Sequence, residues 1–208
     1  MLQRFLTFVS QVPWLWNGLR WLAEAGYRGH YRTIERVLEP RRGSTRRFLD
    51  LGCGTGQFAG SFPAGRYVGV DPTRPYIAYA AGHRPGNYTV MDGSALGLAE
   101  HTFDGALVLG VFHHLSDEIV RRSMVELDHA LTPDATLLVI EDVPPPSLWN
   151  VPGRIMHWLD RGDHIRTDAE YRALFAPHFE VRESFGMRSG ICDYGVYVLA
   201  HRAEAIAR

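Results

Sequence analysis

The stretch Asp50-Leu51-Gly52-Cys53-Gly54-Thr55-Gly56 decides the fold of this chain. An apolar run precedes it and a helical pattern follows it, which predicts a glycine loop between a buried strand and a helix. Glycine allows a sharp turn of the backbone and a close approach of a ligand to it. The free N–H groups at a helix start attract an anion. The stretch therefore predicts a ligand-binding loop at the end of a strand.

Outward from this loop, strand patterns alternate with helix patterns. The predicted strands are residues 47–51, 66–70, 88–91, 103–111 and 135–140, and the predicted helices lie near 57–62, 74–81 and 117–131. A capping box at Thr167 and Glu170 begins a further helix, and residues 178–185 and 196–202 form a predicted antiparallel hairpin. This order predicts an α/β fold, a doubly wound Rossmann-like sheet of seven mostly parallel strands with a C-terminal antiparallel hairpin.

Two acids follow the next two predicted strands. Asp71 ends the run YVGVD, and Asp92 follows Met91 at the end of the third strand, ahead of Gly93. A carboxylate at the first position can accept both ribose hydroxyls of a nucleoside, and one at the second can receive the exocyclic amine of adenine. The glycine spacing is G-x-G-x-G, which differs from the G-x-G-x-x-G of dinucleotide-binding proteins.

Taken in order, DLGCGTG, GVD, MDGSA and FDGALVLGVFHHLSD resemble the class I S-adenosylmethionine-dependent methyltransferases over residues 48–143. The resemblance implies S-adenosylmethionine as cofactor and S-adenosylhomocysteine as product. Tyr76 is expected to pack on the adenine or ribose, or else to lie exposed on its helix, and Cys53 to be a packing residue. The cofactor contacts expected are Asp50, Gly52, Cys53, Gly54, Thr55, Gly56, Asp71, Pro72, Tyr76, Met91, Asp92, Gly93, Leu109 and Gly110.

Two histidines follow the fourth predicted strand, at the edge where open α/β sheets bind ligands. Transfer of a methyl group from a sulfonium is an in-line displacement, so the protein mainly aligns the reactants. A base is needed only when the acceptor loses a proton. The resemblance to the family's HHL motif puts His114 first and His113 second as catalytic candidates. The alternative is a histidine that only shapes the loop.

The acceptor is expected to bind between two aromatic-rich segments. We interpret residues 1–44 as an N-terminal helical cap and residues 45–208 as the methyltransferase domain, with a lid insertion at about 144–166. The resemblance implies that the stretch around GDHIRT lines the acceptor pocket, and the alternative is a charged surface loop. The expected acceptor contacts are Trp21, Tyr27, Tyr31, Glu141, Asp142, His157, His164 and Arg166. For Glu141 and Asp142, which end the fifth strand, the alternatives are that one of them orients a histidine or that one is a solvated loop acid.

These features predict methyl transfer to a small, fairly apolar acceptor, most simply at oxygen or nitrogen. The alternatives are a module that binds the cofactor without catalysis, a methyltransferase of protein side chains, and a nicotinamide oxidoreductase. A formal net charge of −1 and the lack of an Asn/Asp-Pro-Pro-Tyr motif after the fourth strand argue against a nucleic-acid partner. All 22 basic residues are arginine, which excludes lysine Schiff-base chemistry.

Other site classes have little support in the sequence. Two cysteines, Cys53 and Cys192, are too few for a disulfide framework, and no ligand spacing indicates a metal. A reduced, cytoplasmic setting is therefore expected. The apolar segment 5–19 is shorter than the roughly 20 residues of a spanning helix and lacks a convincing cleavage site, so a transmembrane segment and a signal peptide are not expected. An amphipathic helix there, on a pocket or a membrane surface, stays open. The oligomeric state is not determined.

Overall fold

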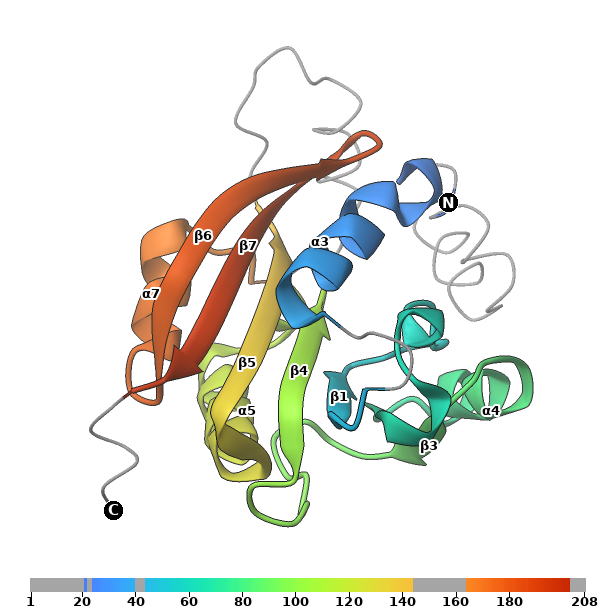
Figure 1. Cartoon of the computed structure of the whole chain (residues 1–208). Helices are drawn as coiled ribbons and strands as arrows, with labels where there is room; N and C mark the ends of the chain where they lie inside the picture. The colour runs from blue at the N-terminus through green and yellow to red at the C-terminus, as the bar shows by residue number, and fades with distance from the viewer. Residues whose placement is uncertain (1–20, 22–23, 40–43, 144–163, 203–208) are drawn as a thin grey trace.

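A seven-stranded sheet organises the chain, in the order β3-β2-β1-β4-β5-β7-β6. The computed structural model describes residues 21, 24–39, 44–143 and 164–202 (Figure 1). The first five strands pair in parallel, whereas β7 is antiparallel to both β5 and β6. The predicted fold class is confirmed. The strands are β1 Phe48–Leu51, β2 Tyr67–Asp71, β3 Asn87–Val90, β4 Phe103–Leu109, β5 Leu131–Asp142, β6 Phe179–Ser189 and β7 Cys192–His201.

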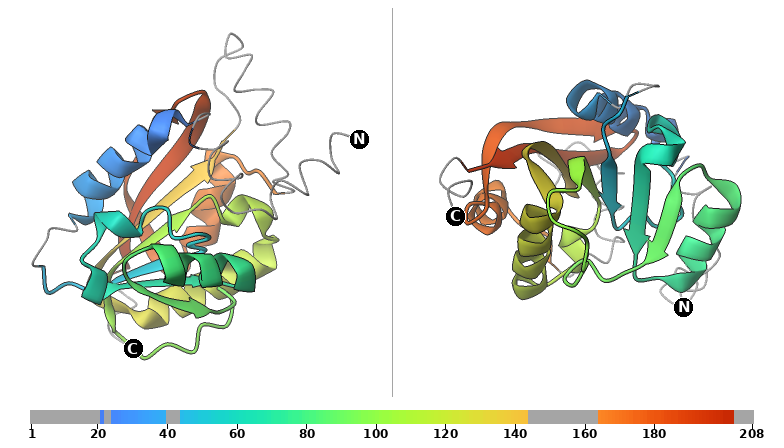
Figure 2. Two further views of the ribbon diagram at one scale, coloured as in Figure 1. Left: turned by 90° about the vertical axis from the view of Figure 1, so that its right-hand side faces the viewer. Right: turned by 60° about the horizontal axis from the view of Figure 1, so that its bottom comes forward.

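Helices cover both faces of this sheet. Figures 1 and 2 show α3 (Arg28–Leu38) on one face, and α5 (Asp117–Ala130) and α7 (Asp168–Phe175) on the other. Alternate side chains of β5 enter two separate cores. Leu137 and Val139 pack in the core under α5 and α7, whereas Leu138 and Ile140 pack in the core under α3. A strand buried on both faces reads as a continuous apolar run, which explains the pattern in the sequence.

Two of the helices, α5 and α7, begin at the capping residues that the sequence predicts. Ser116 accepts a hydrogen bond from the Ile119 N–H at the start of α5, and Asp117 and Glu118 complement the helix dipole. Thr167 and Glu170 form the predicted capping box at the start of α7. A further helix, α4 (Arg74–His83), connects β2 to β3.

The structure differs from the sequence prediction at three elements. The helix expected at 57–62 is only a 3₁₀ turn, Ala59–Ser61, because Gly60 and Pro63 disfavour a longer helix. The final hairpin is much longer than predicted and turns at Gly190, whose φ of 59° suits a tight turn. β5 begins earlier, at Leu131, with a register shift opposite Phe103 and Gly105 that accommodates the irregular start.

The described part of the expected N-terminal cap packs against the sheet. Ile34 and Leu38 of α3 are fully buried in the core with residues of β4 and β5. Of the expected lid insertion, the structure describes residues 164–166, and His157 lies outside the described residues. Within the described ranges, no helix is long and apolar enough to cross a membrane.

Candidate functional site

The glycine loop after β1 turns through three residues with positive φ: 74° at Gly52, 54° at Gly54 and 69° at Gly56. The N–H groups of Gly52 and Cys53 both donate to the carbonyl of Val70, at 2.8 and 3.0 Å, which holds the loop against β2. A Cβ at Gly52 would lie 2.4 Å from Val111 Cγ2, whereas one at Gly54 would meet nothing within 4 Å. The loop is therefore packed on one side and open on the other, as a close-fitting ligand requires.

The two predicted acids lie at the ends of neighbouring strands. Asp71 accepts hydrogen bonds from the Gly54 N–H at 3.1 Å and from the Thr73 N–H at 2.8 Å, so it ties the glycine loop to the start of α4. Asp92 is exposed and accepts from both the N–H and the hydroxyl of Ser94. These hydrogen bonds lower the pKa of Asp92, which keeps its carboxylate ionised.

Beneath the loop, Asp50 and Cys53 are buried. Asp50 accepts a hydrogen bond from the Tyr67 hydroxyl at 2.6 Å. Burial raises the pKa of Asp50 to about 7, the Tyr67 hydrogen bond opposes this shift, and Asp71 adds to it. Burial also raises the pKa of the Cys53 thiol, which keeps it protonated and fits a packing residue.

The remaining residues expected at the cofactor differ in exposure. Tyr76, Met91, Gly93 and Gly110 are half-buried, and Pro72 is exposed. Thr55 and Leu109 are buried, at 6% and 9% relative exposure. Gly110 follows β4 with a φ of 66°, and a Cβ there would meet only the His113 ring, at 3.7 Å. Because β1 and β4 are neighbouring parallel strands, Gly110 lies beside the glycine loop at the same edge of the sheet.

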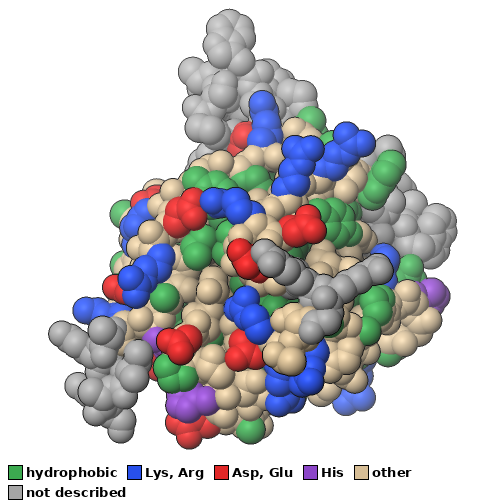
Figure 3. Space-filling view, in the orientation of Figure 1, with side chains coloured by type: hydrophobic (Ala, Val, Ile, Leu, Met, Phe, Trp, Pro, Cys, Tyr) green, Lys and Arg blue, Asp and Glu red, His purple; other side chains and the backbone are tan. Residues whose placement is uncertain are grey.

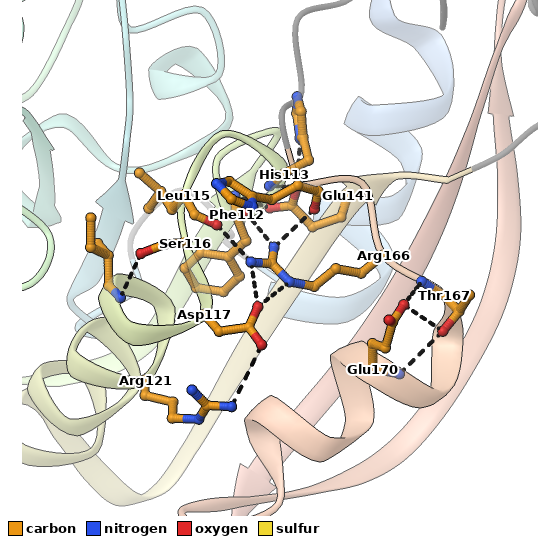
Figure 4. A network of polar contacts seen from close by, with 12 residues as sticks. Phe112, His113, Leu115, Ser116, Asp117, Arg121, Glu141, Arg166, Thr167 and Glu170 are labelled. Carbon is orange, nitrogen blue, oxygen red and sulfur yellow. Dashed lines mark hydrogen bonds and ion pairs between the residues drawn. The ribbon is translucent and has the colours of Figure 1, made fainter.

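A short turn, η4 (Phe112–His114), carries the two histidines, and Glu141 holds it. Glu141 Oε1 accepts from the N–H groups of Val111 and Phe112, at 3.1 and 2.8 Å. Its Oε2 accepts from the His113 N–H at 3.2 Å and lies 2.8 Å from His113 Nδ1. Glu141 is fully buried at the end of β5, so the strand and the turn are locked together (Figure 4).

The adjacent histidines have opposite environments. The His113 side chain is buried against Glu141, whereas the His114 side chain is exposed. Their ring centroids lie 3.9 Å apart. Glu141 therefore pairs with His113, the second of the two catalytic candidates. The ring of His114, the first candidate, contacts the His113 ring.

Of the other residues expected at the acceptor, Arg166 is buried against the same turn. It donates to the carbonyls of Phe112, Leu115 and His164 and pairs with Asp117 (Figure 4). The exposed His164 donates its N–H to the His113 carbonyl at 3.0 Å. Asp142, at 8% exposure, lies opposite Tyr194 where β5 pairs with β7.

The N-terminal aromatic residues contact the segment that follows the glycine loop. Tyr27 is buried against Phe58, with ring centroids 5.5 Å apart. Tyr31 donates its hydroxyl hydrogen to the Gln57 carbonyl at 3.1 Å. Trp21 is 55% exposed.

Sequence reasoning missed a buried acid–histidine pair in this region. Glu24 and His30 are almost fully buried and lie 3.4 Å apart. The His30 ring packs on Tyr194 at 4.6 Å. A signal was present in the sequence, because His30 precedes Ile34 and Leu38 at helical spacing on the core side of α3.

Comparison with known proteins finds similarity over the residues that carry the glycine loop and the histidine turn. A family described as a methyltransferase domain matches residues 49–139. Over 78 residues the chain is 33% identical to a tRNA (carboxymethyluridine(34)-5-O)-methyltransferase of Arabidopsis thaliana. That stretch is 38% of this chain and only 19% of the relative.

Solved structures share the fold across most of the chain. A TehB-like methyltransferase of Corynebacterium glutamicum has a TM-score of 0.64 at 19% identity, over 89% of this chain and 96% of that one. A magnesium protoporphyrin IX methyltransferase of Synechocystis, with bound S-adenosylhomocysteine, has a TM-score of 0.61 at 16% identity, over 84% of each chain. Residues 49–139, which carry the glycine loop and the strand-end acids, thus form a methyltransferase domain, and the chain shares the fold of S-adenosylmethionine-dependent methyltransferases.

Proposed function

We propose that this chain transfers a methyl group from S-adenosylmethionine to a small, fairly apolar acceptor, at oxygen or nitrogen. The supporting observation is the meeting of two structures at one edge of the sheet. The open-sided glycine loop follows β1, and the histidine turn follows β4, the strand beside it. A methyl donor on the first would face an acceptor held near the second.

The residues of the loop fit the cofactor. The open side of Gly54 leaves room for a ligand against the backbone, and Asp71 and Asp92 offer carboxylates at the ends of the next two strands. When bound, the cofactor supplies a methyl group already activated on a sulfonium. The chain then has to align the two reactants and exclude water from them.

For acceptors that lose a proton, we assign the base to His114. Its side chain is exposed and can be reached by an acceptor, whereas the ring of His113 is buried beneath it. Glu141 fixes His113 through Nδ1, and the His113 ring, which contacts the His114 ring at an angle of 46°, in turn orients His114. His113 and Glu141 are thus positioning residues in this proposal.

A labelled-methyl experiment tests the proposal. We expect S-adenosylhomocysteine, and not NAD, to bind in calorimetry, and labelled methyl to enter small molecules of a lipophilic extract. His114→Gln should lower turnover by about 10²–10⁴-fold and leave the affinity for S-adenosylhomocysteine unchanged. Binding without any labelled product would favour a non-catalytic module, and binding of NAD alone would favour an oxidoreductase.

A transfer RNA is the second candidate acceptor, and two observations favour it. The Arabidopsis relative is a tRNA methyltransferase. Residues 28–47 contain seven arginines and two glutamates, an excess that the overall charge conceals. Arg28 and Arg32 are exposed at successive turns of α3, and Figure 3 shows arginine side chains gathered over that region.

The same labelling experiment separates the acceptor classes. Labelled products are sorted into small molecules, RNA and protein, and an RNA acceptor predicts label in the tRNA fraction. Arg28→Ala with Arg32→Ala should then weaken binding of bulk tRNA and lower its salt dependence. A protein acceptor would appear as labelled polypeptide. Label in small molecules alone would exclude both macromolecular readings.

A further inference from the structure

The turn that carries the histidines is held from two sides by opposite charges. Glu141 accepts from the N–H groups of residues 111–113. Arg166 donates to the carbonyls of Phe112 at 2.7 Å and Leu115 at 2.6 Å. An anion at the amide end and a cation at the carbonyl end both stabilise the dipoles of a helical turn. The two side chains come from different elements, and both are buried.

The guanidinium of Arg166 is fully engaged by these contacts. Nη1 donates to the carbonyls of Phe112 and His164, the second at 3.1 Å. Nη2 donates to the Leu115 carbonyl and lies 2.8 Å from Asp117 Oδ1, and Nε donates to that same oxygen at 2.9 Å. An arginine has five N–H donors, so each of them has a partner within the protein.

These contacts join the start of α7 to the histidine turn and to the start of α5, which lie 54 and 49 residues earlier in the sequence. Arg166 directly precedes Thr167, the N-cap of α7, whose capping box fixes the backbone there. Asp117 is the first residue of α5. The histidine turn lies between these two helix starts. The His164 N–H donates a hydrogen bond to the His113 carbonyl of this turn. Figure 4 shows Arg166 reaching from the start of α7 to the turn and to Asp117.

We propose that Arg166 is a positioning residue that holds His113 and His114 in place from the carbonyl side of their turn, rather than a residue that binds the acceptor. The proposal rests on the proposed function only in assigning a catalytic use to the histidines. With every donor of Arg166 engaged and the residue 5% exposed, an acceptor could bind it only by displacing contacts that define the turn. Glu141 contacts only the amide side of the turn, so the carbonyls of Phe112 and Leu115 are held by Arg166 and not by Glu141.

Lysine cannot replace this arrangement. Its three donors lie on a single nitrogen, whereas the five of arginine diverge from a planar group. Arg166→Lys keeps the charge and loses the geometry, and Arg166→Met keeps much of the side-chain length and loses both. Arg121→Met is the matched control, because Arg121 contacts the same Asp117 from the exposed side, at 3.6 Å.

The test reads the histidine rings directly, by long-range ¹H–¹⁵N NMR of protein labelled at its ten histidines. In Arg166→Met and Arg166→Lys, we expect the ring signals of His113 and His114 to shift or broaden. Amides 111–115 should exchange with solvent at least tenfold faster. His178 and His201, which pair with Asp128 at the far end of α5, should not change and serve as internal references. Arg121→Met should match the wild type.

Two further measurements keep the proposal testable. If Arg166→Met does not fold, Asp117→Asn removes the charge from one partner, and a smaller shift in the same ring signals is expected. In Arg166→Ala, millimolar guanidinium should restore part of the wild-type signals, which a general loss of packing would not allow. Affinity for S-adenosylhomocysteine should change less than twofold in each folded variant.

The proposal is overturned if the His113 and His114 signals of a folded Arg166 variant superimpose on those of the wild type. It is also overturned if these signals change no more than in Arg121→Met. A wild-type protein that does not bind S-adenosylhomocysteine would refute the proposed function instead. The ring spectra would still decide the role of Arg166.

Discussion

The two halves of the site are built on different principles. The glycine loop is shaped by backbone conformation, with three positive φ angles and one side left open at Gly54. The histidine turn is shaped by side chains from distant elements, since Glu141 lies at the end of β5 and Arg166 precedes α7. The glycine loop is held by the end of the next strand, 17 residues away at Asp71, whereas Glu141 holds the turn from at least 28 residues away.

The contrast indicates where each half is vulnerable. The hydrogen bonds of the loop are made within β1, β2 and the start of α4, so a change at Gly54 has local consequences, whereas Gly52 lies close against Val111 at the histidine turn. Removal of a buried charge from the turn leaves amides or carbonyls unsatisfied in the core, which costs much more than a lost surface contact. The following experiments measure this difference.

The largest effect is expected at Glu141. Glu141→Ala leaves three backbone N–H groups and the His113 ring without their acceptor in a buried position. We expect a loss of about 3–5 kcal/mol in the free energy of unfolding, the usual cost of removing one partner from a buried pair. Urea unfolding measures it. Glu183→Ala, which breaks an exposed pair with Arg36, is the control and should cost less than about 1 kcal/mol.

Two glycines of the loop separate stability from binding. Gly52→Ala places a methyl group 2.4 Å from the stiff side chain of Val111, at a φ of 74°. We expect about 2–4 kcal/mol of destabilisation from overpacking and backbone strain together. Gly54→Ala bears only the strain, about 1–2 kcal/mol, and its methyl group enters the open side of the loop.

Thermal unfolding measures the stability of both glycine variants, and calorimetry measures their affinity for S-adenosylhomocysteine. Gly54→Ala should lose more affinity for S-adenosylhomocysteine than its small loss of stability implies. Equal affinity for this ligand in Gly54→Ala and the wild type would show that the open side is not where the cofactor approaches.

A smaller effect is expected at Asp71, which fastens the loop to β2. Asp71→Asn keeps the shape of the side chain and removes the charge that accepts from Gly54 and Thr73. Affinity for S-adenosylhomocysteine should fall by about 1.5–3 kcal/mol, as for other hydrogen bonds to charged groups. Calorimetry measures it, with circular dichroism to show that the variant is folded. Unchanged affinity would contradict a role for Asp71 at the ribose.

The most gradual effect is a dependence of stability on pH that arises from Asp50. Its pKa is raised from 3.8 to about 7 in the folded state, so the folded protein holds a proton that the unfolded chain has released between these values. Stability from this group is therefore present at low pH and declines as pH rises toward 7, by at most about 1.4 kcal/mol per pH unit.

Urea unfolding between pH 5 and 8 tests the Asp50 prediction. Asp50→Asn keeps an acceptor for the Tyr67 hydroxyl and should remove this part of the slope. The difference in unfolding free energy between wild type and variant should then change across this range and level off above pH 7. A difference that stays constant with pH would show that Asp50 is ionised throughout.

The sequence alone was sufficient to predict the sheet and the glycine loop. Short apolar runs, turn glycines and caps such as Ser116 and Thr167 act over a few residues, so their outcome can be predicted from a short stretch of sequence. It also located the strand-end acids Asp71 and Asp92, because parallel strands bring their carboxyl ends to one edge. The helix after the loop was overestimated, because its periodicity did not account for Gly60 and Pro63.

The side-chain contacts that hold the histidine turn could be identified only from the tertiary structure. The sequence analysis ranked His114 above His113 and placed Arg166 at the acceptor, because the family resemblance implies that the stretch around GDHIRT lines the acceptor pocket. The folded chain buries His113 on Glu141 and engages all five donors of Arg166. Apart from His164, these partners are separated by 28 to 54 residues in the sequence, and strand order and helix packing bring them together. No local pattern specifies which donor meets which acceptor, since that choice is made when buried polar groups must all be satisfied at once.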